Sequence, residues 1–163
     1  MNVASLTALA AHWPTDWILI GACAVFVALV AWRGGIGRPA SLVLALPLAF
    51  FVFQSLSSAA IVGSALVQLQ TPLAQSGIFL ILVIAAYMFV HRIIGFYADA
   101  QGLPMQSLIA GAATAVLILV FWLQVAPLSS IWHFGLQVQT IFGEGYRLWW
   151  LVLAYLALAL VRT

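Results

Sequence analysis

Side chains that could support acid–base or metal chemistry are few in this sequence. Its 163 residues include three carboxylates, three histidines and one cysteine. Asp16 lies between Trp13 and Trp17, and an acid within a bilayer is often functional. Tryptophans, however, favour the membrane interface, where Asp16 would cap the first turn of a helix by accepting its N–H groups. We predict an interface cap and keep an ion or proton site as the alternative.

His91, Arg92 and Asp99 form a second group of titratable residues. Arg92 and Asp99 are seven residues apart, so a continuous helix would place both on one face. His91 would then be available for the proton relay of a transporter. The simpler interpretation is an interfacial anchor with a surface ion pair, which contributes about 0–1 kcal/mol. We favour the anchor.

Motifs for metal binding or nucleophilic catalysis are missing from the sequence. His12 and His133 have no partner at ligand spacing, and no H-x-x-x-H, C-x-x-C or E-x-x-H occurs. The single Cys23 allows neither an intramolecular disulfide nor a metal cluster built on sulfur. The serines have no G-x-S-x-G context. We predict that the protein is not an enzyme and needs no cofactor or metal.

The composition indicates an integral membrane protein. Hydrophobic residues make up 66% of the chain and charged residues only 5%, whereas soluble domains carry about 25% charged residues. Residues 39–91 and 100–143 contain no Lys, Arg, Asp or Glu, and a crossing helix needs about 20 apolar residues. With no lysine and no basic run, nucleic-acid binding is not expected. The predicted fold class is an all-α polytopic membrane protein.

Four to five transmembrane helices are expected, in a single membrane domain over residues 1–163. The last run of apolar residues is short for a span, so it either crosses a thinned bilayer or packs as a half-buried helix on the others. The expected spans are 15–32, 41–63, 73–92, 107–126 and 148–161.

Residues 129–143 have the pattern of an amphipathic helix that could lie in the plane of the membrane interface. Its apolar and polar residues fall on opposite helical faces. The apolar ones are Ile131, Phe134, Val138 and Phe142, and the polar ones are His133, Gln137, Thr140 and Glu144.

Small residues recur at helical spacing in the second and fourth expected spans. Such faces let another helix pack closely in a bilayer. We interpret them as sites of packing with other membrane proteins or with a second copy of the chain, which is surrounded by membrane lipids. The residues are Ser55, Ala59 and Gly63 in the second span, and Ala110, Gly111, Thr114 and Ala115 in the fourth.

An alternative function is that of a small oligomeric channel or transporter subunit. Polar residues of the second span and just after it would line the path, although hydroxyls in helices commonly bond their own backbone. A lysis holin is a third possibility, but the charged tail that many holins carry is missing. The path residues would be Gln54, Ser55, Ser57, Ser58, Gln68 and Gln70.

The arginines predict the orientation of the chain. Arg33, Arg38, Arg92 and Arg162 would all lie on one side of the membrane, and Arg147 would lie on the other. The positive-inside rule makes the first side cytoplasmic. The N-terminus is then outside and the C-terminus inside if the last run crosses. The glycines beside Arg33 would form a tight cytoplasmic turn, with Arg38 holding it in place.

A pattern across the first two spans adds a resemblance. Asp16 opens the first span, Arg33 and Gly34 begin the turn, and Ser41 with Leu42 opens the second span. This layout resembles the colicin V production protein family. The resemblance implies a small bacterial inner-membrane protein that is needed for toxin export and envelope integrity, with no established catalytic mechanism.

The second half of the chain is less similar to that family. Gly102, Gly111 and Trp132 match its glycine-rich start of the fourth span and the tryptophan-containing segment that follows. Arg38 stands near the place where the family usually has an acid. Gln106 and the serine after it replace the family's usual Asp-Arg pair.

Overall fold

The computed structural model describes residues 15–58, 71–94 and 103–161, and these are helical almost throughout. The helices are α2 (Thr15–Gly34), α3 (Gly37–Ser58), α5 (Pro72–Ile94), α6 (Pro104–Gln124), α7 (Ala126–Ile131), α8 (Leu136–Ile141) and α9 (Arg147–Val161). Four of them, α2, α3, α5 and α6, are long and apolar enough to cross a membrane. The protein is therefore an all-α polytopic membrane protein, as its composition predicts.

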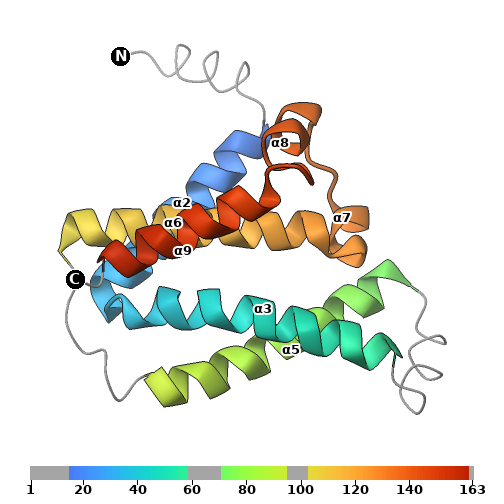
Figure 1. The fold of residues 1–163 in the computed structure, drawn as a ribbon, viewed down its shortest axis with the longest axis horizontal. Coiled ribbons are helices and arrows are strands. Elements are labelled where there is room, and N and C mark those ends of the chain that lie inside the picture. The colour runs from blue at the N-terminus through green and yellow to red at the C-terminus, as the bar shows by residue number, and fades with distance from the viewer. Residues whose placement is uncertain (1–14, 59–70, 95–102, 162–163) are drawn as a thin grey trace, which may run out of the picture.

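The helix ends that have described residues on both sides lie within four residues of the expected spans; they are the end of α2, the starts of α3, α5 and α9, and both ends of α6. The agreement follows from the bilayer, because each crossing helix must cover about 30 Å of hydrocarbon. Helix α9 has 15 residues, which correspond to about 22 Å. It packs along α6 (Figure 1).

Helix α6 is the centre of the bundle. It packs against α2, α3 and α9, whereas α5 packs against α3 and α7 (Figure 1). Of the residues in the apolar part of α6, 56% are buried, against 17% in α2 and in α5. Its many small residues explain this position, because they let neighbouring backbones approach closely.

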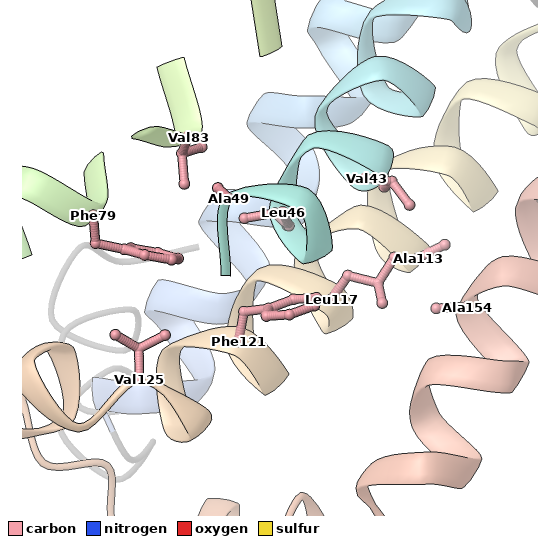
Figure 2. Close-up of a cluster of buried hydrophobic side chains, with 10 residues drawn as sticks. All are labelled: Val43, Leu46, Ala49, Phe79, Val83, Ala113, Leu117, Phe121, Val125 and Ala154. Carbon is pink, nitrogen blue, oxygen red and sulfur yellow. The ribbon is translucent and has the colours of Figure 1, made fainter. Parts of the chain in front are cut away.

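The main hydrophobic core lies between α3, α5, α6 and α9 (Figure 2). Aromatic rings join the helices there: Phe53 and Phe79 pack edge to face with centroids 5.7 Å apart, and Phe50 and Phe121 do so at 5.9 Å. This geometry suits the ring quadrupoles. The buried residues of this core are Val43, Leu46, Ala49, Phe79, Val83, Ala113, Leu117, Phe121, Val125 and Ala154.

The turn between α2 and α3 depends on two glycines. Gly35 has φ of +81°, a left-handed conformation that residues with a side chain rarely adopt. Gly34 leaves room for the guanidinium of Arg38, since a Cβ at Gly34 would lie 2.6 Å from the Arg38 Cζ. The tight turn expected from the sequence therefore brings an arginine back over the end of α2.

A proline in α3 explains how α9 is attached. Pro47 lies inside α3, and it has no N–H to offer the carbonyl of Val43 one turn earlier. The hydroxyl of Tyr155 on α9 donates to that carbonyl oxygen at 3.2 Å. Because Val43 is buried, an unpaired carbonyl there would be costly. Tyr155 thus completes the hydrogen bonding of α3 and joins α9 to it.

The segment expected to be one amphipathic helix over 129–143 is instead two short helices. Helix α7 ends at Ile131, the backbone is extended at Trp132, and α8 begins at Leu136. A hydrogen bond from another helix holds this break in place. The carboxylate of Asp16 on α2 accepts from the backbone N–H of Gly135, just before α8.

Burial within this segment follows the expected face for three of its four apolar residues. Phe134, Val138 and Phe142 are buried, whereas Ile131 is 45% exposed. The buried three form a second core with Leu119 and other residues of α6. The apolar face is therefore covered by the protein's own helices.

Candidate functional site

One end of the bundle gathers positive charge. The last turn of α2, the first turn of α3 and the last turn of α5 lie together at one end (left in Figure 1). They carry Arg33, Arg38 and Arg92, all exposed. Arg147 lies at the opposite end, where it pairs with Glu144 at 3.8 Å. We call the first of these the cationic end. Arg162, expected on the same side, lies outside the described residues.

A polar contact joins α3 to α5 at the cationic end. The Ser41 Oγ lies 3.4 Å from the His91 Nδ1. The serine donates its own proton to the carbonyl of Gly37 at 2.7 Å, so its oxygen is left to accept from the histidine. The His91 ring stacks on Tyr87 with centroids 5.5 Å apart. His91 therefore has structural partners, and Asp99, its other expected companion, lies outside the described residues.

An apolar groove begins beside these arginines and runs between α2, α3 and α5. One hollow of about 330 Å³ has Arg38 at its rim, and an adjoining hollow of about 290 Å³ has both Arg33 and Arg38. The two hollows share Phe26, Val30 and Arg38. The remaining lining is almost wholly apolar, from residues such as Leu42 and Ile84. We call the two hollows together the cationic groove.

The other end of the bundle is covered by the chain itself. The segment from Trp132 to Trp150, which we call the cap segment, folds over α2 and α6 near the start of α9 (Figure 1). The indole N–H of Trp150 donates to the Ile141 carbonyl at 2.8 Å. The guanidinium of Arg147 reaches the carbonyl of Leu123 in the last turn of α6 at 3.5 Å, where a positive charge suits the helix dipole. We call this the capped end.

Asp16 acts at the capped end with a different partner from the one expected. It lies in the first turn of α2, as predicted. Its described hydrogen bond, however, is to the backbone N–H of Gly135, at 2.6 Å. The cap segment crosses the start of α2 and presents this N–H to the carboxylate. Asp16 therefore ties the cap segment to α2.

An apolar cavity of about 350 Å³ lies between α2, α6 and the cap segment. Cys23 and Trp122 contribute to its lining, with Trp132 and Phe134 from the cap segment. The Cys23 thiol is free and half-buried among apolar neighbours. These surroundings are those of a small apolar filler between helices.

The small-residue face of α6 is occupied inside the chain. A Cβ added to Gly111 would lie 2.6 Å from the Ala24 carbonyl oxygen and 2.7 Å from the Ala28 Cβ, both on α2. Ala110, Thr114 and Ala115 are also buried. At Gly111, the helix that packs closely on this face is therefore α2 of the same chain.

The small-residue face expected in the second span is described only in part. Ser55 lies on an exposed part of α3, while Ala59 and Gly63 lie outside the described residues. The same is true of Gln68 and Gln70 from the suggested channel path.

Buried hydroxyls in the described helices bond their own backbone. The hydroxyls of Ser41, Ser76, Ser107 and Thr114 each donate to the carbonyl one turn earlier, at 2.7 to 3.3 Å. This is the usual way for a helix to satisfy a serine or threonine. Within the described residues, no three His, Cys, Asp or Glu side chains are grouped so as to hold a metal ion.

No family model matches the chain, and neither the curated proteins nor the solved structures include a match. The functional argument therefore depends on the geometry of the chain itself.

The sequence pointed to part of this arrangement. The arginines at the turn were identified from their position between two apolar runs. The groove beside them was missed, because it exists only where α5 lies next to both α2 and α3. The signal that was available is Gly34, which has no side chain, followed four residues later by Arg38 on the other side of the turn.

Proposed function

We propose that this chain is a non-enzymatic accessory protein of a bacterial inner membrane, and that it acts by helix packing with a partner membrane protein or with a second copy of itself. The observation that carries the proposal is the outer face of α5. This helix packs mainly on α3 and α7, and among the described residues the side turned away from them is exposed and apolar.

The outer face of α5 suits a neighbouring helix. Gly77, Ile81, Ala85 and Met88 follow one another at spacings of four, four and three residues, so they share one helical face. Ile81 is 66% and Met88 62% exposed. A Cβ at Gly77 would meet nothing within 4 Å, and a glycine in that setting allows another backbone to come close.

The centre of the molecule is not available for the same purpose. The face of α6 around Gly111 already holds α2, and α6 is surrounded by α2, α3 and α9. A partner helix therefore has to dock at the periphery. Among the described helices, α5 packs substantially against just one other crossing helix, α3, whereas α2 packs against both α3 and α6.

The arginines support a cytoplasmic location for the cationic end, by the positive-inside rule. In the same arrangement the capped end, with Asp16 and Glu144, faces the periplasm. Fusion of a reporter enzyme at the α2–α3 turn and another in the 143–146 turn would test this orientation, because only the second should be exported.

Site-directed cross-linking in membranes tests the partner face. With Cys23→Ala as background, Ile81→Cys and Met88→Cys should give a discrete cross-linked product. Leu153→Cys, also exposed on α9, at 54%, is the matched control and should give none. Adding Gly77→Leu should abolish the product by filling the contact. Equal cross-linking from α5 and α9, or none from either, would reject the α5 face.

The finer role that we propose follows from the resemblance to the colicin V production family, namely support of peptide-toxin export and envelope integrity. Complementation tests it directly. Expression in a bacterium that lacks its own member of that family should restore colicin V export, and Gly77→Leu should lower the restoration. Failure to restore export, with the protein present in the inner membrane, would leave the packing role and remove the toxin-export role.

A further inference from the structure

The cationic groove joins two properties that match one class of molecule. Its rim carries the guanidinium groups of Arg33 and Arg38, and its floor is made of apolar side chains from three helices. An anionic phospholipid has the complementary form, with a phosphate at the membrane surface and acyl chains below it. We propose that the cationic groove is a binding site for one anionic phospholipid.

The charge at the rim is not neutralised by nearby acids of the described chain. Both described acids, Asp16 and Glu144, are placed at the capped end, and the ion pair among described residues is that of Arg147 with Glu144. Arg33 and Arg38 line the same hollow, so two positive charges can face one phosphate. Arginine suits this task, because its planar donors match phosphate oxygens.

Gly34 fixes the position of one of these guanidinium groups. The Arg38 side chain lies directly over Gly34, where an added Cβ would be 2.6 Å from Cζ and Nε and 2.7 Å from Nη1. The arginine is therefore folded back toward the end of α2 and toward Arg33. This arrangement concentrates charge at the rim, where helices long enough to cross a membrane begin or end. Basic residues between transmembrane helices bind anionic headgroups in such places.

The apolar part of the groove has the depth that an acyl chain needs. Phe26 lies seven residues before Arg33 on α2, and Leu80 lies seven residues before Tyr87 on α5. Seven residues of helix extend about 10 Å, so the groove reaches from the arginines well into the hydrocarbon layer. Ile84 is 50% exposed along this path, as expected for a surface that a lipid tail covers.

Lipid retention by the purified protein tests the proposal. The full chain in an uncharged detergent is titrated with phosphatidylglycerol or phosphatidylcholine of identical acyl chains, and bound lipids are counted by native mass spectrometry. We expect one phosphatidylglycerol to be held in preference to phosphatidylcholine. Arg38→Gln should weaken this binding about fivefold, the effect expected for one arginine near an anionic surface.

Matched variants distinguish binding in the cationic groove from a general attraction of anionic lipid to positive charge. Arg92→Gln removes the same charge at the same end, outside the groove lining, and should leave binding unchanged. Gly34→Ala keeps both arginines but displaces the Arg38 guanidinium, and should weaken binding. Ile84→Trp fills the groove and should weaken binding with all arginines in place. Circular dichroism of each variant verifies its helical content, so that a loss of binding reports on the site.

Three results would overturn the proposal. Equal retention of the two lipids would remove the phosphate selectivity. An Arg92→Gln variant as weak as Arg38→Gln would assign the effect to total charge. Displacement of the lipid by millimolar glycerol phosphate, together with full binding by Ile84→Trp, would assign it to a headgroup site without a tail groove. None of these outcomes bears on cross-linking at the α5 outer face.

Discussion

The capped end and the cationic end both carry apolar helix surface beyond the central core, but within the described residues this surface is covered by protein at the capped end alone. There, residues 132–150 lie across α2 and α6, and side chains such as Asp16 and Trp150 bond backbone groups of the cap segment. At the cationic end the groove between α2, α3 and α5 stays open in the described chain and is flanked by Arg33 and Arg38.

This difference separates two uses of polar side chains in a membrane protein. At the capped end they join segments that are far apart in the sequence, as Asp16 and Gly135 do across 119 residues. At the cationic end the arginines are exposed, and we expect them to orient the chain in the membrane and to bind lipid. Mutations at the first end should therefore lower stability, and mutations at the second should change binding or orientation.

The largest loss of stability is expected where α2 crosses α6. This contact holds α2 in place, and α2 contributes to both the capped end and the cationic end. Gly111→Leu places a side chain where even a Cβ would be 2.6 Å from the backbone oxygen of Ala24. Backbone cannot yield as a flexible side chain can, and overpacking costs about 1–3 kcal/mol or more. Thermal unfolding in detergent should show a loss at the upper end of this range.

A glycine on α2, the other helix of this pair, provides the control. Gly21 of α2 has nothing within 4 Å of an added Cβ, so Gly21→Ala should be neutral or stabilise by up to about 1 kcal/mol through better helix propensity. If Gly111→Leu unfolds at the same temperature as Gly21→Ala, the close α2–α6 crossing is wrong.

The contact of α9 with α3 should give the next largest effect. Tyr155→Phe leaves the Val43 carbonyl without a donor, because Pro47 cannot supply one. A buried unpaired carbonyl costs about 1–3 kcal/mol, although hydrogen bonds between membrane helices average nearer to about 0.6 kcal/mol. We expect a loss of about 1 kcal/mol in the free energy of unfolding.

A double-mutant cycle identifies the cause of that loss. Pro47→Ala restores an N–H to Val43, so Tyr155→Phe should cost less in a Pro47→Ala background than in the wild type. Tyr146→Phe, at a tyrosine that is 60% exposed, should have no effect. Equal costs of Tyr155→Phe in both backgrounds would show that the proline does not create the need for the tyrosine.

The sequence predicted the crossing helices well, because bilayer thickness and apolar length determine them together. It also predicted close packing at Gly111, since small residues at helical spacing permit it. It did not identify α2 as the neighbour of Gly111. In a membrane, lipid is as apolar as the protein interior, so hydrophobic patterning does not distinguish a lipid-facing side from a packed one.

The cap segment shows a second limit of sequence reasoning. The burial of Phe134, Val138 and Phe142 was anticipated from helical periodicity, yet the helix breaks between Ile131 and Leu136. Periodicity reports which residues are covered but not whether the backbone is continuous. The break is tied to α2 by Asp16, a contact that only the folded arrangement can supply.

The hydrogen bond of Asp16 should have a smaller and more local effect. Asp16→Ala removes the acceptor of the Gly135 N–H at 2.6 Å. The site is partly exposed, so we expect a cost below the roughly 1.5–3 kcal/mol of hydrogen bonds to charged groups, about 0.5 kcal/mol. Amide exchange should accelerate in the cap segment and not in α3 or α5. Asp16→Asn keeps an acceptor oxygen, so its amide exchange rate in the cap segment should lie between those of the wild type and of Asp16→Ala. Uniform acceleration over the bundle would contradict a local tie.

The smallest effect on stability is expected for Arg92→Gln at the cationic end. Arg92 is exposed and has no ion pair with a described residue, and surface substitutions of this kind stay within about 0.5 kcal/mol. Its charge nevertheless contributes to orientation by the positive-inside rule. A reporter fused in the 143–146 turn should therefore show a fraction of inverted molecules, while the unfolding temperature stays unchanged.

Arg147→Gln, at the capped end, should lower the unfolding temperature and leave the orientation unchanged, because the Arg147 guanidinium holds the last turn of α6 through the Leu123 carbonyl. If Arg92→Gln lowers stability as much as Arg147→Gln does, the division between a structural end and an orienting end does not hold.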